Sequence, residues 1–176
     1  GNGANDVFVR DLLKNTTERV SVDSAGVEAN GGSVACDISQ DGRFVAFESF
    51  ADNLVAGDTN GRADVFVRDR RAGTTVRASV DAAGAQSNQR CGAPTISSDG
   101  RYVAFVSRAD NLVPGDTNAT QDAFVKDLTT GAIDRVSVDS GGVEGNGWTG
   151  EVRISGDGML AVLLSSATNL VAGDTN

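Results

Sequence analysis

The chain consists of short apolar runs separated by glycine and polar turn residues. In its middle part these runs cover residues 93–97, 102–107, 123–127 and 132–138. Valine, phenylalanine and isoleucine dominate the runs, and no apolar period of 3.6 residues is sustained. Each run is therefore typical of a short β-strand and not of a helix. The pattern predicts an all-β protein.

Turn residues connect the predicted strands into antiparallel hairpins. An Asp-Gly pair at 99–100 joins the first two runs, and Thr-Thr-Gly at 129–131 joins the last two. The Val-Phe-Val run at 65–67 is apolar at successive positions, as expected of a strand that is covered on both faces. Four-stranded sheets stacked face to face around an axis cover both faces of a strand, so the pattern predicts a β-propeller.

The whole pattern repeats every 58 residues without an insertion. The motif Asp-Val-Phe-Val-Arg-Asp at 6–11 returns at 64–69 and, as Asp-Ala-Phe-Val-Lys-Asp, at 122–127. We therefore expect residues 1–176 to form a single propeller unit with three blade-equivalents of four antiparallel strands. The repeats cover approximately residues 3–60, 61–118 and 119–176.

The segment 96–107, Ile-Ser-Ser-Asp-Gly-Arg-Tyr-Val-Ala-Phe-Val-Ser, followed by the motif at 122–127, resembles the WD-like Pro-Asp repeat of bacterial TolB-type β-propellers. The resemblance implies that the Asp-Gly element ends the inner strand of a blade, and that the next two runs are its second and third strands. It also implies an extracellular or periplasmic location. Two features depart from the family: its proline is replaced by Gln40, Ser98 and Gly156, and the loop between the second and third strands is longer. Both departures weaken the transfer of TolB's own partners to this chain, whereas the expected fold is unaffected.

The same alignment starts the chain with the third and fourth strands of one blade and ends it with the first and second strands of another. Unpaired strand edges recruit partners. Two copies joined head to tail would complete each other's split blade, giving a homodimer with a six-bladed ring, and six is the blade count of the family. The alternative is a fragment of a longer chain that closes within itself. The first residue, Gly1, with no methionine and no signal-peptide pattern, is typical of such an excised fragment.

Composition excludes several classes of function. The chain has 15 basic and 24 acidic residues, a net charge of −9, which argues against a nucleic-acid partner. No apolar run approaches the length of a membrane span. The chain has no histidine, so Ser-His-Asp and Cys-His nucleophiles and His-ligated zinc or iron are excluded. Cys36 and Cys91 lie outside the repeat and lack metal-ligand spacing; we interpret both as buried or half-buried free thiols, with a disulfide as the alternative.

The loop between the second and third strands carries oxygen side chains at its positions 1, 3 and 7. This arrangement predicts a Ca²⁺ site, and the alternative is a turn capped by local hydrogen bonds. In the third copy the two halves of the loop would meet across the dimer interface. The candidate ligands are Asp58, Asn60 and Asp64; Asp116, Asn118 and Asp122; and Asp174, Asn176 and Asp6.

The loop that leads from one blade into the next recurs with Asp, Gly and Asn at fixed offsets. One interpretation is turn geometry that needs a positive φ at Gly and Asn. The other is a polar rim that binds a sugar or a peptide, with an aromatic platform in one copy. The candidate ligand-binding residues are Asn30, Asn88, Asn146 and Trp148.

Together these features favour a non-catalytic propeller that binds a protein or a carbohydrate through long loops on one face. Two alternatives stay open. One is an accessory propeller of a larger hydrolase, whose catalytic residues lie elsewhere or in clustered carboxylates. The other is a purely structural repeat assembly that has no ligand.

Overall fold

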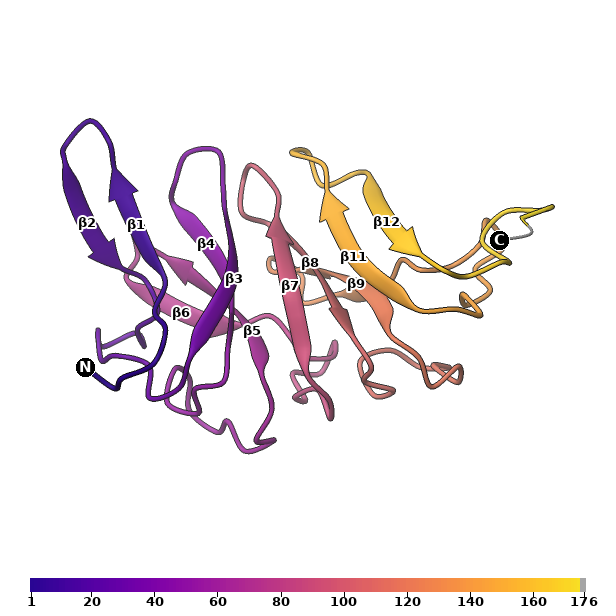
Figure 1. Ribbon diagram of the computed structural model, residues 1–176, viewed down its shortest axis with the longest axis horizontal. Helices are drawn as coiled ribbons and strands as arrows, with labels where there is room; N and C mark the ends of the chain where they lie inside the picture. The colour runs from indigo at the N-terminus through magenta and orange to yellow at the C-terminus, as the bar shows by residue number, and fades with distance from the viewer. Residues whose placement is uncertain (175–176) are drawn as a thin grey trace.

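The computed structural model describes residues 1–174, and this part of the chain is all β, without a helix (Figure 1). It contains four antiparallel sheets, two with four strands and two with two strands. The strands are β1 (Phe8–Asp11), β2 (Thr16–Arg19), β3 (Ser33–Ile38), β4 (Phe44–Ser49), β5 (Asp64–Asp69), β6 (Thr74–Arg77), β7 (Cys91–Ile96), β8 (Tyr102–Ser107), β9 (Asp122–Asp127), β10 (Ile133–Arg135), β11 (Thr149–Ile154) and β12 (Ala161–Ser165).

Each four-stranded sheet is a propeller blade with its strands in chain order, β3-β4-β5-β6 and β7-β8-β9-β10. The pairs β1-β2 and β11-β12 stand at the two ends of the row (Figure 1). The innermost strands of successive sheets, β3, β7 and β11, lie side by side. The predicted fold class, an all-β propeller with three blade-equivalents, is confirmed.

Hairpin turns and long loops occupy opposite ends of the blades. The turns after β3, β7 and β11 lie together at the top of Figure 1, and the long loops lie at the bottom. Gly100 in the second of these turns has a φ of +76°, and a Cβ there would overlap the Phe44 ring of the preceding blade. This position needs glycine both for its backbone conformation and for the packing of one blade on the next.

The core lies between the sheets and explains the continuous apolar runs. Four residues of β5 in a row are buried, as predicted for a strand covered on both faces. Within the blades Phe47 stacks on Phe66, and Phe105 stacks on Phe124, with 5.9 Å between the ring centroids of each pair. The long loops take part in the core, because Leu54 is fully buried in one of them.

Polar contacts also join the blades. Lys126 on β9 donates from Nζ to the backbone carbonyls of Val80 and Asp81, 3.1 and 2.9 Å away, in the loop that enters its blade. It donates to the Gly131 carbonyl of its own hairpin at 2.7 Å. Burial lowers the pKa of Lys126. The same site on β5 is filled by Arg68, which donates to the Asp23 carbonyl at 2.9 Å.

Two predicted strand boundaries were wrong. The strand predicted at 93–97 is β7, which begins two residues earlier, at Cys91. The run at 132–138 is shorter, because β10 ends at Arg135. Beyond it the chain folds back on itself, and Val138 forms an isolated bridge to Glu144 within its own loop. Local pairing thus replaces the outer end of the predicted strand.

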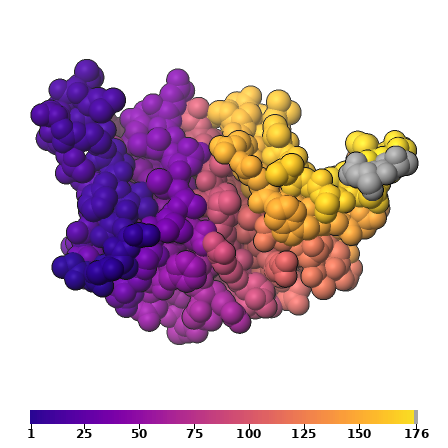
Figure 2. All heavy atoms as spheres, in the orientation of Figure 1, coloured from indigo at the N-terminus to yellow at the C-terminus, as the bar shows by residue number. Residues whose placement is uncertain are grey.

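The end sheets expose apolar side chains at positions that the inner blades bury. Val162 on β12 is 71% exposed, whereas its repeat counterpart Ala104 is fully buried. Phe8 on β1 is half exposed, and its counterpart Phe66 is fully buried. Figure 2 shows the β1–β2 hairpin standing apart from the rest of the molecule.

Within residues 1–174 no helix is long and apolar enough to cross a membrane.

Candidate functional site

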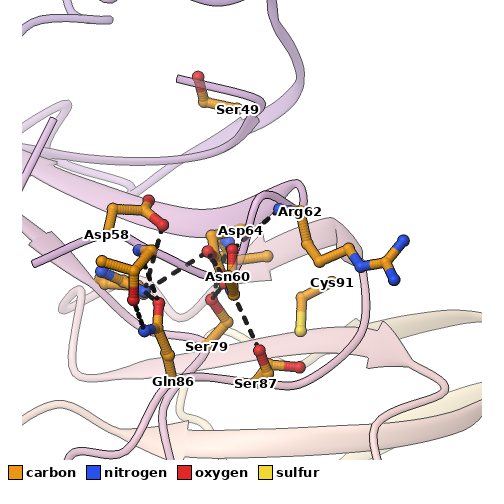
Figure 3. Close-up of polar contacts among 12 residues, drawn as sticks. Ser49, Asp58, Asn60, Arg62, Asp64, Ser79, Gln86, Ser87 and Cys91 are labelled. Atoms are coloured by element: carbon orange, nitrogen blue, oxygen red, sulfur yellow. Dashed lines mark hydrogen bonds and ion pairs between the residues drawn. The ribbon is translucent and has the colours of Figure 1, made fainter. Parts of the chain in front are cut away.

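The predicted cation loop is folded around its own side chains (Figure 3). Asn60 donates from Nδ2 to Asp64 Oδ2 at 2.9 Å and to the Ser87 carbonyl at 3.0 Å. Its Oδ1 accepts a hydrogen bond from the Arg62 amide at 2.9 Å. Asp64 is fully buried, and its Oδ1 accepts from Ser79 Oγ at 2.5 Å. The capped-turn alternative therefore accounts for both polar atoms of the Asn60 side chain.

A buried arginine supplies positive charge to this loop. Arg77 NH1 lies 3.6 Å from Asp58 Oδ1 and 3.6 Å from Asp64 Oδ2, and all three side chains are almost completely buried. Burial raises the pKa of both carboxyls, against the opposing effect of Arg77. Asp58 Oδ2 is buried and has no hydrogen-bond partner among residues 1–174, which makes the charged form of Asp58 costly.

The second copy of the loop has the same design. Asn118 donates to Asp122 Oδ2 at 2.9 Å, and Arg135 NH1 lies 3.3 Å from Asp116 Oδ1. Arg135 also pairs with Glu144 at 2.7 Å. Burial, together with the nearby charge of Asp122, raises the pKa of Asp116 to about 6.

In the third copy, Asp6 accepts from Ser21 Oγ at 2.7 Å and lies 3.5 Å from Arg19 Nε. Asp174 engages in contacts of its own, and Asn176 lies outside the described residues. The arginine and serine that contact these acids form an Arg-x-Ser motif, which recurs at the same 58-residue spacing as the acids. The sequence could therefore have revealed these partners: Arg19 and Ser21, Arg77 and Ser79, Arg135 and Ser137. Among residues 1–174 no group of three or more acidic or cysteine side chains is placed to hold a metal. Ca²⁺ binding stays a prediction.

The recurring asparagines connect the two kinds of long loop. Asn88 donates from Nδ2 to Asp110 Oδ1 at 2.6 Å, and its backbone amide donates to Asn111 Oδ1 at 3.0 Å. Asn30 makes the matching bonds to Asp52 and Asn53, and Asn146 makes them to Thr168 and Asn169. These contacts confirm that both loops emerge on one face.

The positive-φ interpretation of this loop holds for its glycines alone. Gly26, Gly84 and Gly142 have φ between 84° and 88°. None of the three asparagines has a positive φ, because each serves through its side chain as a clamp between loops and not as a left-handed turn residue. The clamps hold the loop face in one arrangement.

A cavity of about 440 Å³ opens at the loop end of the innermost strands. Its floor is made of small residues, Ala35 on β3, Gly92 and Ala93 on β7, and Gly150 on β11. Its polar residues are Glu48, Gln89, Arg90, Arg108 and Gln121. A second cavity of about 330 Å³ is also lined by Ala35, Ala93 and Gly150, so the two cavities adjoin along the innermost strands; together they are called the trough.

The polar side chains of this cavity belong to one repeat more than to the others. Positions such as Asp64, Phe66 and Asn88 recur in all three copies, but the polar positions of the cavity do not, and this departure is the sequence signal that motif searching missed. At the matching positions of the other two copies, Gln89 is replaced by Gly31 and Gly147, and Arg90 is replaced by Gly32 and Trp148. Arg108 is replaced by Phe50 and Ser166, and Gln121 is replaced by Asn5 and Ala63. These four side chains all lie next to strands of the blade β7–β10.

Glu48 and Arg90 form an ion pair in the cavity wall. The Glu48 side chain is almost fully buried at a position that is Val106 in the next copy. Its Oε1 accepts from Arg90 Nε at 2.8 Å and lies 2.7 Å from Arg90 NH2. The Arg90 guanidinium lies 5.9 Å from the ring centroid of the exposed Phe50. Arg90 therefore neutralises the buried carboxylate of Glu48.

The predicted aromatic platform, Trp148, lies next to the same cavity. Its ring packs on Gly150, where a Cβ would overlap it, and the side chain is still 45% exposed. Trp148 thus has a packing contact on one face and open surface beside a cavity residue.

Of the two cysteines, both are free as predicted, but the expected burial was wrong for Cys36. Cys36 follows Ala35, which has a positive φ at a β-bulge, and it is exposed in the trough.

Cys91 is the buried thiol of the pair. Its Sγ lies 3.3 Å from Ser107 Oγ, and burial raises the pKa of Cys91 to about 12. At this pKa the thiolate, which is the nucleophile and metal ligand, is scarcely populated at neutral pH. Cys91 is a packing residue.

Comparisons with known proteins place this architecture among the TolB-like β-propellers. The chain resembles TolB from Acinetobacter baumannii with a TM-score of 0.53 at 18% identity, over 90% of this chain and 31% of that one. It resembles a putative TolB from Agrobacterium tumefaciens with a TM-score of 0.54 at 14% identity, over 94% of this chain and 47% of that one. The predicted TolB-like fold is confirmed. At these identities the likeness concerns the fold.

A structure of prolyl endopeptidases also matches, with a TM-score of 0.50 at 13% identity, over 91% of this chain and 22% of that one. The chain spans less than half the length of each of these three structures. No protein-family model and no curated protein sequence matches the chain.

Proposed function

We propose that the chain is a non-catalytic binding module of the β-propeller class, which recognises a protein or a glycan at the inner rim of its long-loop face. One observation carries this proposal. The cavity at that rim is lined by Gln89, Arg90, Arg108 and Gln121, four polar side chains, none of which recurs at the matching position of another copy. The gathering of these polar side chains around one cavity favours a ligand there over a purely structural repeat.

The scaffold around the cavity favours recognition by a preformed site. The Asn88 clamp ties the loop that carries Gln89 and Arg90 to the loop that follows Arg108. A rim that is ordered before binding loses little conformational entropy when a ligand arrives. Long loops on a rigid β scaffold are a common place for binding sites.

The chemistry of the cavity supports binding more than catalysis. Glu48, its carboxylate, is held in an ion pair by Arg90, and the chain has no histidine. A second candidate function, an accessory propeller of a larger hydrolase, is supported by the likeness to prolyl endopeptidases. In that case the catalytic groups lie on another part of the protein.

The test is a paired screen of the wild-type chain. Glycan and peptide arrays are probed with the fluorescent protein, and peptidase and glycosidase substrates are assayed with the same preparation. We expect saturable array binding without turnover. Turnover by the purified chain, or two empty arrays, contradicts the proposed binding role.

We also propose a homodimer as the assembly, in which β12 of one copy pairs with β1 of the other. The exposed apolar side chains of β12 and β1 support this pairing, because the inner blades bury the equivalent positions between β8 and β9. Transferring that register pairs Val162 with Val9, and Leu163 with Phe8.

A further inference from the structure

We propose that Arg108 forms a carboxylate-binding subsite in the rim cavity, and that this subsite takes the C-terminal carboxylate of a peptide. The proposal rests on the proposed binding function and names the chemistry of its ligand. Arg108 lies directly after β8, at the mouth of the cavity.

The two arginines of the cavity differ in whether an acidic side chain pairs with them. Arg90 is bound to Glu48 through two contacts of 2.8 and 2.7 Å. Arg108 lines the same cavity, and its side chain has no hydrogen-bond or ion-pair partner among residues 1–174. A planar guanidinium with free donors binds a carboxylate through two parallel hydrogen bonds.

The local charge limits the kind of anion. Glu48, Arg90 and Arg108 together give the cavity one net positive charge, in a chain whose net charge is −9. A single negative charge is compensated there, whereas a phosphate dianion or an acidic polymer also meets repulsion from Glu48 and from the acidic surface. The site therefore favours one carboxylate at the end of an otherwise neutral ligand.

The trough favours a peptide as the bearer of that carboxylate. It runs from Arg108 over Ala35, Ala93 and Gly150, whose small side chains allow a backbone to approach closely. The innermost strand β7 pairs in its sheet with β8 alone, but the Ile96 amide on its other side is bonded to Asp37 Oδ2 at 2.9 Å, so the peptide would lie over the small residues without being added as a strand. Trp148 beside Gly150 offers apolar surface to a side chain near the peptide terminus.

The experiment uses N-acetyl-phenylalanine and its C-terminal amide as matched probes. The arginine Nε–Hε signals of the ¹⁵N-labelled chain are followed during titration with each compound. We expect Arg108 to shift with the acid and to respond at least about tenfold more weakly to the amide, since a charge-assisted bond contributes about that factor. Glucuronic acid and inorganic phosphate, the competing anion sources, should bind more weakly than the acid.

Two variants make the assignment specific. Arg108→Gln removes its own signal, so the readout in this variant is the Arg90 Nε–Hε signal of the same cavity, whose shift with the acid should be lost at an unchanged melting temperature. Arg62→Gln is the control, because Arg62 is another arginine of the loop face whose side chain has no partner among the described residues, and it lies outside the cavity. Equal binding of acid and amide, unchanged acid binding by Arg108→Gln, or tighter binding of glucuronic acid or phosphate overturns the proposal. Array binding that survives Arg108→Gln would remove the subsite and leave the binding module standing.

Discussion

At the scale of single residues, the chain places buried arginines where its sequence alone suggested a metal ion. Arg77 and Arg135 each lie against acids of a long loop, and each is almost completely buried. The Asp and Asn positions of the loops were found from the sequence because they recur. Their partners were missed because Arg-x-Ser lies at the end of another strand, and nothing local in the sequence brings the two segments together.

Asp116 should make stability fall as the pH rises. Its pKa is raised from 3.8 to about 6 in the folded chain, so between these values the folded state binds the proton more tightly than the unfolded state. Folding therefore loses stability as the pH rises through about 4 to 6, and the loss is complete above that window. Asp116→Asn, which mimics the neutral form, should gain about 1–2 kcal/mol more at pH 8 than at pH 4 relative to wild type. Urea unfolding at both pH values measures this, and an equal effect at both contradicts it.

The capped-turn alternative to the Ca²⁺ site predicts the same melting temperature in Ca²⁺ and in excess chelator. Arg77 already supplies positive charge between Asp58 and Asp64, and Asn60 Oδ1 is used by a backbone amide. A bound ion would raise the melting temperature by mass action. A saturable rise with Ca²⁺, absent with Mg²⁺, would instead establish the predicted cation site.

At the scale of strands and loops, turn chemistry was the most predictable part of the fold. The Asp-Gly and Thr-Thr-Gly turns lie where the sequence puts them, because Gly100 and Gly131 both adopt a positive φ. The end of β10 was not predictable, since Val138 is as apolar as a strand residue and only its bridge to Glu144 shows that it belongs to a loop. The rim cavity was also missed, because its side chains come from three blades and form no motif.

Gly100→Ala should be strongly destabilising. The substitution places a side chain at φ +76° and drives its Cβ into the Phe44 ring of the neighbouring blade. We expect a loss of about 2–4 kcal/mol from both causes. Gly115→Ala is the matched control, since Gly115 has a φ of +75° but open space around it, and should cost about 1 kcal/mol. Equal losses in urea unfolding would show that the blade contact contributes nothing.

At the scale of the whole molecule, a regular repeat builds the scaffold and departures from the repeat distinguish its surfaces. The architecture follows from the sequence because the 58-residue period, the turn signals and the apolar runs all indicate stacked four-stranded sheets. The ligand does not follow in the same way, because the proposed site lies at positions where the copies differ, such as Arg108 and Phe50, and no repeated motif marks them.

The proposed pairing of β12 with β1 has a direct consequence for mass. Light scattering at micromolar concentration should give twice the chain mass of 18.0 kDa. Val162→Lys should shift the equilibrium towards monomer, because it places a charge on a face that the inner blades bury. A wild-type chain that stays at 18.0 kDa at every concentration contradicts closure by a second copy.

The central claim is that polar side chains around the blade β7–β10 form a binding site on a scaffold that the copies share. Its most direct test is a variant that restores residues of the other copies, Gln89→Gly, Arg108→Ser and Gln121→Ala, while keeping the Glu48–Arg90 pair. Wild type and variant are compared on the same peptide and glycan arrays, with melting temperatures measured in parallel. The account predicts that the variant keeps its melting temperature within a few degrees and loses array binding. A variant that folds equally well and binds the same ligands would contradict it.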